Sequence, residues 1–470
     1  ASVLIYSHKI KHSGTLFVRN TTLGVHMDFL KDLKPAPYLR PMLNLGCLLD
    51  IGTGRYYVGE YGESILNGGL SHLTGVGGRG NTFKSTLMFF MMLRVLDRYS
   101  KSAGHVYDTE MSLTIARLYE LAQQHMPNIA GHDLEAEQRM SITDKTMYNG
   151  SEWYDMLKSS TADRKKEIKS DMGRTPFLDR DRKPIQYLYP LVVGLDSLSQ
   201  FTSANVLRIQ EDGDVGDSSR NVEALRDGGA KTQLIMELPT VTARNGIYML
   251  LSAHVGDEFA MDPRSPPSKK LAFLKNKAKF KNTPEKFTFL MNNCWYCISA
   301  SPLIDGDKKP EFPRNKDDDL KGDTDLMMVN LVNLRAKSGP TGMPMDVVVS
   351  QSDGVHVGLT EFNYIKQSRF GIDGNLQNYT LSLVPDIKLS RTVLRRKIDE
   401  HPQLQRALEI TSEMAQMSDM WHDLPPGLMC QPRELYADLI AKGYDWSVLL
   451  ATRGYWTHDN DKHPVPFLST

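Results

Sequence analysis

The run GVGGRGNTFKST, from Gly75 to Thr86, constrains the fold of this chain more than any other stretch. Gly78 is followed by five residues and then by Lys84 and Ser85, which is the spacing of a phosphate-binding loop. Small residues allow consecutive backbone N–H groups to curl around an anion. The apolar-rich sequence after the loop predicts a helix whose N-terminus points at the same anion. The run therefore predicts a strand, a phosphate-binding loop and a helix.

Within this loop, Lys84 offers a charge to the outer phosphates of a nucleotide, and the Ser85 hydroxyl is suited to ligate Mg²⁺. The residue before Lys84 is Phe83, where the strict pattern has glycine. Taken alone, the run therefore leaves open a glycine-rich turn with a chance lysine. The residues expected to contact the nucleotide are Gly78, Arg79, Gly80, Asn81, Thr82, Phe83, Lys84, Ser85 and Thr86.

The composition is that of an ordinary globular chain and excludes several classes of protein. The 470 residues are 40% hydrophobic and 24% charged, and the formal net charge is zero, so any charge that binds nucleic acid must be local. Four cysteines do not suggest a disulfide framework. No apolar run approaches ~18 residues and no apolar leader is present, so we expect no membrane contact and a cytoplasmic location.

Two apolar strands downstream of the loop are predicted to end in acidic residues. GHVYD, at 104–108, is followed by Thr109 and Glu110, and PLVVGLD, at 190–196, ends in Asp196. A carboxylate at the end of a strand beside a phosphate loop can activate an attacking water, which we expect of Glu110. We expect Asp196 to hold Mg²⁺. Taken singly, Glu110 is also explained as an acid at a helix N-terminus, and Asp196 as a turn former.

A third apolar strand, GIYMLLSA at 246–253, ends at His254. A polar side chain at this strand end is placed to sense the γ-phosphate of a nucleotide. A histidine that only caps the strand is the alternative.

The most basic segment runs from Arg264 to Phe287 and has eight Lys/Arg against one acid, with three phenylalanines interleaved. Cations neutralise phosphates and aromatic rings stack on bases, so we expect this segment to bind DNA, with a solvated basic loop as the alternative. A Gly- and Asp-rich segment at 210–231 is expected to form a loop and a helix that add further cations. The expected DNA-binding residues are Arg220, Arg226, Lys231, Lys269, Lys270, Lys275, Lys277, Lys279 and Lys281.

Two later features carry weaker signals. Cys294 and Cys297 form a CxxC, but the other cysteines show no paired spacing, so a core strand is preferred to a zinc site. The sequence SGPTG predicts a turn between two strands. Arg335 and Lys337 precede that turn on one face of a strand, where they could clamp phosphates or simply line a half-exposed surface.

The order of these segments resembles the RecA-type ATPase core, and most closely the UvsX-like recombinases of T4-like phages. Four places carry the resemblance: PMLNLGC from Pro41, TFKS with its phenylalanine before the loop lysine, VYDTEMSLTIARL, and SAHVGDE. It covers roughly residues 25–385 at the level of motifs. The stretch 255–325, where the second DNA-binding loop would lie, departs strongly from the family.

The resemblance implies roles for several residues. Glu110 takes the place of the catalytic glutamate, Arg117 falls near the position that packs on adenine, and His254 takes the place of the γ-phosphate sensor. ATP and Mg²⁺ are the implied cofactors, and single-stranded DNA and further copies of the chain are the implied partners. NLRAKSGPTG also resembles a hairpin of DnaB-like helicases, whose Lys-x-Arg pair reaches the ATP of the neighbouring subunit. Here the order is Arg335-x-Lys337, which completes the site of an adjacent protomer if the resemblance holds.

We therefore expect an α/β, RecA-like fold with a central, mainly parallel sheet flanked by helices. The expected parts are an N-terminal arm at 1–40 (a possible subunit-docking arm), an ATPase core at 41–385 with insertions near 125–190 and 255–325, and a small helical domain at 386–470. The leading functional hypothesis is a DNA-dependent ATPase that forms recombinase filaments on single-stranded DNA. The alternatives are a hexameric DnaB-like helicase motor and a RecA-fold regulatory or scaffolding protein.

Overall fold

The computed structural model describes most of the chain. The arm predicted for 1–40 lies outside the described residues, as do Lys269, Lys270, Lys275 and Lys277 of the basic segment. The described residues are 41–60, 62, 64–167, 172–179, 181–212, 219–242, 245–257, 272–274, 278–315, 324–375, 377–420 and 430–452.

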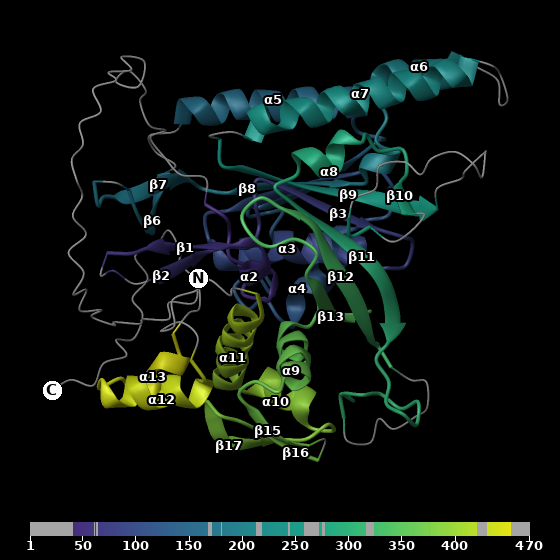
Figure 1. Cartoon of the computed structure of the whole chain (residues 1–470). Helices are drawn as coiled ribbons and strands as arrows, with labels where there is room; N and C mark the ends of the chain where they lie inside the picture. Colours follow the sequence, from purple (N-terminus) through teal and green to yellow (C-terminus); the bar gives the residue numbers. More distant parts are fainter. Residues whose placement is uncertain are drawn as a thin grey trace.

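A central, mainly parallel sheet organises the structure (Figure 1). Its strand order is β14-β13-β12-β11-β3-β9-β8-β4-β5, and β10 pairs with β9. Neighbours from β11 to β5 are parallel, whereas β12, β13, β14 and β10 join their neighbours in antiparallel fashion. The strands are β3 (Leu73–Gly78), β4 (Ala103–Asp108), β5 (Met140–Asp144), β8 (Leu191–Asp196), β9 (Ile247–Asp257), β10 (Ala278–Phe280), β11 (Asn293–Pro302), β12 (Leu326–Ala336), β13 (Pro344–Ser350) and β14 (Gly354–Val355).

The predicted α/β fold with a central, mainly parallel sheet flanked by helices is confirmed. Strand β9 lies between β3, which leads into the glycine-rich loop, and β8, which ends in Asp196. The three strands run in the same direction, so their carboxyl ends meet at one edge of the sheet. This edge is where ligands bind in open α/β sheets.

The central strands are buried on both faces because side chains alternate between the two sides of a strand. In β9, Tyr248 and Leu250 belong to one hydrophobic cluster, and Met249 and Leu251 belong to the other. Because β9 is covered on both faces, its sequence is continuously apolar, and this pattern is what predicted a buried strand.

Helices cover both faces of the sheet (Figure 1). One cluster contains α3 and α4, and the other contains residues of α5, α7 and α8. In α3 almost every residue is buried, which explains the run of phenylalanine, methionine and leucine. The helices are α3 (Lys84–Arg98), α4 (Ile115–Gln123), α5 (Gly150–Glu167), α6 (Ala204–Asp212), α7 (Ser219–Thr242) and α8 (Lys286–Leu290).

The lead-in to the loop differs from the β-rich segment that the sequence predicts. It holds the hairpin of β1 (Arg55–Val58) and β2 (Ser64–Asn67), but also a short helix, α2 (Leu49–Thr53). The buried carboxylate of Asp50 accepts hydrogen bonds from three preceding backbone N–H groups, which stabilises the helix start.

The region predicted as an insertion near 125–190 supplies the edge strand β5, helix α5 and a separate hairpin of β6 (Met172–Leu178) and β7 (Pro184–Leu188). The turn predicted from DRDRKP is present, with the N–H of Asp179 donating to the carbonyl of Lys183.

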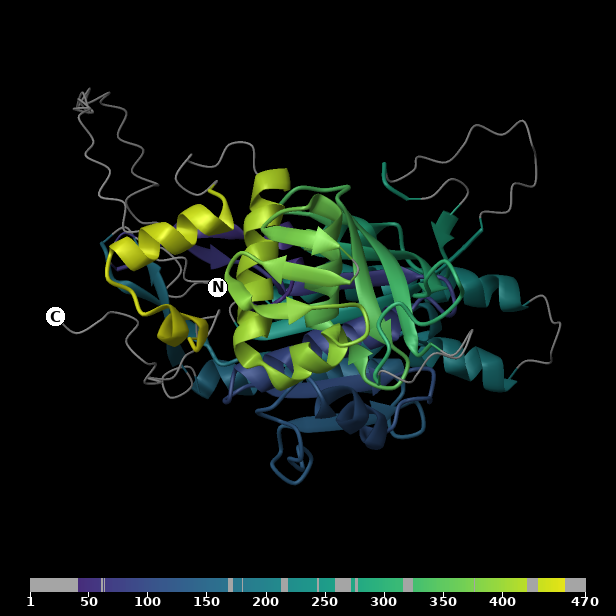
Figure 2. The same ribbon diagram turned by 90° about the horizontal axis from the view of Figure 1, so that it is seen from below.

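The C-terminal part packs below the helix layer of the sheet (Figures 1 and 2). Helix α11 contacts both α9 and α2, and its apolar residues share one cluster with the core. The expected boundary at 385/386 falls inside β17, so the separate helical domain stays a prediction. The elements are α9 (Val357–Ser368), β15 (Ile372–Asn375), β16 (Asn378–Leu381), β17 (Val384–Leu389), α10 (Leu394–Glu400), α11 (Pro402–Met420), α12 (Pro432–Ala441) and α13 (Trp446–Leu450). No described helix is both long and apolar enough to cross a bilayer.

Candidate phosphate-binding site

The glycine-rich loop connects the buried strand β3 to the N-terminus of α3. A side chain at Gly78 would meet the Thr82 hydroxyl at 2.4 Å, so glycine is required where the chain leaves the strand. The Thr82 hydroxyl donates to the carbonyl of Arg79 across the loop at 2.8 Å. No side chain at the N-cap position, Phe83, accepts from the first N–H groups of α3. These groups are therefore available to an anion.

Phe83 departs from the strict loop pattern, and its backbone explains why that pattern has glycine. It adopts a left-handed conformation with φ of 59° and ψ of 23°. This conformation costs a residue with a Cβ about 1–2 kcal/mol. The partly buried ring packs against the main hydrophobic cluster, which offsets that cost.

Two variants separate the backbone of Phe83 from its ring. Phe83→Ala removes the ring and keeps the left-handed strain, whereas Phe83→Gly removes both. We expect Phe83→Gly to be more stable than Phe83→Ala by about 1 kcal/mol. Urea unfolding of both variants measures the difference. Equal stability, or a more stable alanine variant, would contradict the left-handed assignment.

Asp196, at the end of β8, is 5% exposed and lies beside the start of α3. Its carboxylate accepts a hydrogen bond from the hydroxyl of Ser252, and the hydroxyl of Ser85 lies close enough to lower its pKa as well. Burial raises the pKa of Asp196, and the two serines only partly oppose the rise. Hydroxyl and carboxylate oxygens are the donors that Mg²⁺ prefers, so the Ser85–Asp196 pair fits that ion.

Glu110 follows β4 and His254 belongs to β9, and the two side chains contact each other although β8 lies between these strands. His254 Nε2 lies 2.7 Å from Glu110 Oε1, and both side chains are about three-quarters buried (28% and 29% exposed). Burial raises the pKa of Glu110, but the hydrogen bond from His254 and the charge of Lys84 lower it, and the net shift is downward. Glu110 is therefore ionised at neutral pH, the form that accepts a proton.

The loop that carries Glu110 is held by Asp108, whose role the sequence did not reveal. Its carboxylate accepts from the N–H groups of Glu110, Ser112 and Leu113 at 2.9, 2.7 and 2.7 Å. Thr109 exchanges hydrogen bonds with Ser197 at the end of β8. An acid at the last position of a strand is the signal that could have identified Asp108 as the residue that orders this turn.

Lys84 is 8% exposed, and its charge acts on the pKa of both Glu110 and Asp196. The ammonium group therefore lies within electrostatic reach of both carboxylates. The strand register agrees, since Gly78 pairs with His254 and Asp108 pairs with Asp196. Four segments that are far apart in sequence thus bring one cation, two carboxylates, a hydroxyl and an imidazole to the same edge of the sheet.

Arg79 lies in the loop but forms a two-pronged ion pair with Asp257 at the end of β9. Asp257 is the last described residue before the stretch 258–271. Asp257 could not be singled out from the sequence, because its partner is 178 residues away. The pair joins the glycine-rich loop directly to the strand that carries His254.

The described cations of the predicted DNA-binding set fall into two groups. Lys279 and Lys281 are exposed at β10, and the N–H of Lys281 donates to the carbonyl of His254 at 2.9 Å. Arg226 is exposed on α7, the helix that also contains Arg220. Because Lys279, Lys281 and Arg226 are exposed, a DNA strand could contact them without any change in the fold.

Lys231 requires a correction. It is 2% exposed, pairs with Asp227 at 2.7 Å and donates to the carbonyls of Ser199 and Asn282. This placement contradicts direct contact with DNA, because a paired cation inside the protein does not meet a phosphate. The helical period of α7 turns Lys231 inward, which the charge pattern alone did not reveal.

Arg117, on α4, donates to the carbonyls of Gln351 and Ser352 at 2.8 and 3.0 Å and pairs with Glu120. These bonds fix the guanidinium beside the turn between β13 and β14. Its contact with adenine stays a prediction.

Arg335 and Lys337 lie at the other edge of the sheet from the glycine-rich loop. In the strand register, Arg335 of β12 lies opposite Cys294 of β11, and Cys294 lies opposite Gly75 of β3. Gly75 is three residues before Gly78. Three residues of a strand span roughly 10 Å, so the pair does not reach the phosphate loop of its own chain. Arg335 instead stacks on the exposed ring of Phe289, 5.2 Å from its centroid, and Lys337 donates to the carbonyl of Leu290.

Cys294 and Cys297 are both buried on β11, and burial raises the pKa of each thiol to about 12. They are core residues in this structure, as preferred from the sequence.

No family model matches the sequence, and no curated protein matches it. Among solved structures, the chain is similar to the crystal structure of the RadB recombinase. The two chains are 14% identical, and the match covers 62% of this chain and 92% of that chain with a TM-score of 0.32. A likeness at this identity and TM-score does not assign the chain to a family.

Proposed function

We propose that this chain is a Mg²⁺-dependent ATPase of the RecA type that forms recombinase filaments on single-stranded DNA. The observation that carries the proposal is the meeting of Lys84, Ser85, Glu110, Asp196 and His254 at the carboxyl edge of the sheet. A glycine-rich turn with a chance lysine would not explain why the other four side chains converge on it.

Each residue has a role that its position supports. The N–H groups of the loop and of the start of α3 bind the phosphates, and Lys84 neutralises the β- and γ-oxygens. Mg²⁺ held by Ser85 and Asp196 would supply further neutralisation of the phosphates. Glu110, ionised and held by the Asp108 turn, orients and deprotonates the attacking water.

His254 connects nucleotide to DNA in this proposal. Its imidazole contacts Glu110, and its carbonyl accepts from Lys281 in the basic segment. The Arg79–Asp257 pair links the phosphate loop to the same strand. A γ-phosphate that displaces Glu110 from His254 would therefore move the strand end to which the cations are attached.

The DNA site is proposed at the basic segment and α7. Cations there would neutralise backbone phosphates, and the interleaved phenylalanines would stack on bases. ATP turnover would then release DNA. The UvsX-like relationship, strand exchange and a location in the cytoplasm (that of the host cell if a phage encodes the chain) belong to the same proposal.

Neutralising four lysines of the basic segment tests the DNA site. We expect Lys275→Ala, Lys277→Ala, Lys279→Ala and Lys281→Ala together to weaken binding of single-stranded DNA. Each lost phosphate contact should reduce the slope of log affinity against log salt by about 0.7. Fluorescence anisotropy across a salt series measures both effects.

The matched control replaces Lys158 and Lys166, which are exposed on α5 and paired with acids one turn away. That variant should keep the wild-type slope. Unchanged affinity in the fourfold variant would move the DNA site elsewhere on the chain.

A hexameric helicase motor is the second candidate. The position of Arg335 and Lys337 favours it as much as a filament, because a pair that acts on a neighbouring subunit serves a ring or a helix equally. A scaffolding protein with a degenerate site is less favoured, since Glu110 and Asp196 are both in place.

Electron microscopy with single-stranded DNA and a non-hydrolysable ATP analogue separates these candidates. Helical filaments would support the recombinase, and closed rings would support the helicase. A chain that stays monomeric in the presence of both single-stranded DNA and the ATP analogue would overturn both proposals.

A further inference from the structure

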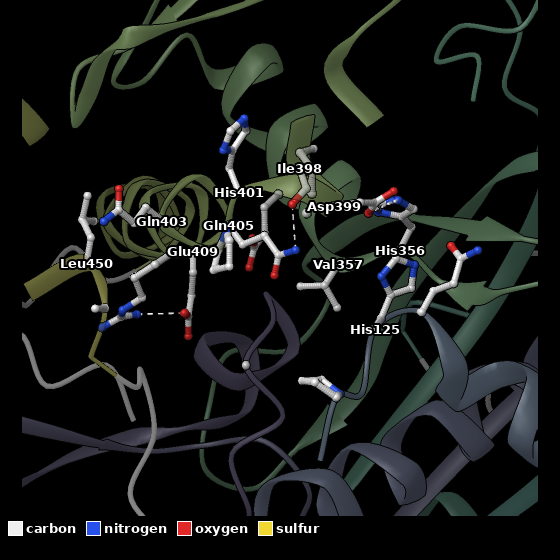
Figure 3. Close-up of a pocket in the computed structure, with 18 of the residues that line it drawn as sticks. His125, His356, Val357, Ile398, Asp399, His401, Gln403, Gln405, Glu409 and Leu450 are labelled. Atoms are coloured by element: carbon white, nitrogen blue, oxygen red, sulfur yellow. Dashed lines mark hydrogen bonds and ion pairs between the residues drawn. The ribbon is translucent and has the colours of Figure 1, made fainter. Parts of the chain in front are cut away.

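A pocket of about 780 Å³ lies on the far side of α3 from the sheet, between the core and the C-terminal helices (Figure 3). At one end of this pocket, His125 and His356 lie side by side, with Asp399 next to them. Their rings are 4.4 Å apart between centroids, and His356 Nε2 is 3.7 Å from Asp399 Oδ1. None of these three residues belongs to the proposed ATPase site.

The two imidazoles have ring nitrogens that the fold leaves without partners. His356 is 1% exposed, and its buried Nε2 has no hydrogen-bond partner among the described residues. The buried Nε2 of His125 likewise has none among them. Buried polar atoms are nearly always paired, so two orphaned nitrogens beside one carboxylate call for a shared ligand.

We propose that His125, His356 and Asp399 bind a divalent transition-metal ion, with zinc as the ion that the donor set fits. One donor atom from each residue lies within 4.8 Å of the others. Zinc bonds of ~2.0–2.2 Å bring its donors closer than this, so binding requires only a small inward shift of the side chains. Two imidazoles and one carboxylate select zinc over Mg²⁺ or Ca²⁺, which prefer oxygen ligands alone.

The protonation states agree with this geometry. Burial lowers the pKa of His125 to about 4 and lowers the pKa of His356 well below its ordinary value. Both imidazoles are therefore neutral at pH 7, which is the form that ligates a metal. Burial raises the pKa of Asp399 to about 6, so its carboxylate is mostly ionised at that pH.

Two arginines whose charge acts on His356 are both paired with acids, which weakens their repulsion of a metal ion. Arg395 bonds to the carboxylates of Asp325 and Asp353, and Arg314 bonds to the same two acids. These bonds leave the positive charges of both guanidinium groups balanced by acids within the protein.

One existing contact would be lost. The N–H of Leu359 donates to His356 Nδ1 at 3.4 Å. A metal at Nε2 places the proton on Nδ1, which ends this bond. A contact of that length is at the weak end of hydrogen bonding, so the loss is small beside the gain of a metal bond.

The ion would fasten three separate elements together. His125 follows the C-cap of α4, His356 is the N-cap of α9, and Asp399 belongs to α10. Arg94 of α3 donates to the carbonyl of His125 at 2.9 Å and so fixes the loop that carries it. The fourth coordination position would face the pocket and be filled by water. The ion would thus hold the C-terminal helices against the sheet domain.

The test uses the full, untagged chain after treatment with a chelator and dialysis. Zinc is added, and its stoichiometry and affinity are measured by calorimetry, with Co²⁺ as a spectroscopic substitute. We expect one high-affinity zinc, a melting temperature that rises with zinc concentration, and visible Co²⁺ bands of a tetrahedral site. Asp399→Asn and His125→Ala should each weaken zinc binding at least tenfold.

His132→Ala is the matched control, because His132 is a half-exposed histidine seven positions along the same loop and pairs with Glu137. It should bind zinc as the wild type does. Asp399→Asn changes only a partly exposed side chain, so a folded variant is expected and circular dichroism checks it. The proposal is overturned if the wild type binds no zinc, or if Asp399→Asn and His125→Ala bind it as tightly as the wild type.

Discussion

Replacing Lys84 with alanine is expected to abolish ATP turnover. Lys84 is buried, its charge acts on both Glu110 and Asp196, and it is the cation expected to contact the phosphates in the proposed site. Its removal leaves the γ-phosphate facing two carboxylates without neutralisation, which we expect to cost at least about 100-fold in rate. Phosphate release in the presence of single-stranded DNA measures the effect. Lys158→Ala, an exposed change on α5, is the control and should turn over ATP normally.

Glu110→Gln gives the same prediction a sharper form, because glutamine keeps the shape of the side chain and its hydrogen bond with His254 while losing the base. We expect turnover to fall by about 10²–10⁴-fold. Titration with a fluorescent ATP analogue should show affinity near that of the wild type, unlike Lys84→Ala, which loses binding as well. Normal turnover in either variant would remove the ATPase assignment.

The pH dependence follows from the direction of the pKa shift of Glu110. The hydrogen bond from His254 and the charge of Lys84 outweigh burial and lower this pKa below its ordinary value of 4.5. The carboxylate is therefore ionised throughout the range from pH 5 to 8. Protonation of Glu110 should not reduce turnover anywhere in that range.

The edge of the sheet that carries the site was predictable from the sequence. Apolar strands that end in Asp108 and Asp196 must place these residues at one edge if the strands are parallel, as they are. The predicted strand end at His254 was wrong, because β9 continues to Asp257, but His254 still lies level with Gly78. The contacts across that edge were not predictable. Ser252 bonds to Asp196 because β9 lies next to β8, and strand order is a property of the whole fold.

Two other features depended on three-dimensional context. Lys231 has the charge of a DNA contact, but the direction in which α7 presents it decides that it is buried. Phe83 contradicts the loop pattern in sequence, yet the structure gives it the left-handed backbone that the pattern implies. In both cases the sequence shows the residue type but not its conformation. The direction of the Lys231 side chain and the backbone conformation of Phe83 decide what each residue does.

Replacing Arg335 and Lys337 is the second change expected to cause a large loss of ATP turnover. They lie away from the phosphate loop of their own chain, beside the exposed ring of Phe289, and Arg335 Nε has no hydrogen-bond partner among the described residues. A cation that reaches the phosphates from a neighbouring subunit contributes about 10³–10⁵-fold to turnover. We expect the double variant Arg335→Ala, Lys337→Ala to lose at least about 10³-fold, while Lys158→Ala with Lys166→Ala loses nothing.

Mixing two inactive variants decides whether this pair acts on a neighbour. The double variant keeps Glu110, and Glu110→Gln keeps Arg335 and Lys337. If subunits assemble head to tail, about a quarter of the interfaces in an equal mixture combine an intact base with an intact cation pair. The mixture should therefore recover about a quarter of wild-type turnover, although each variant alone is inactive. No recovery would mean that the pair serves its own chain, which its register on β12 argues against.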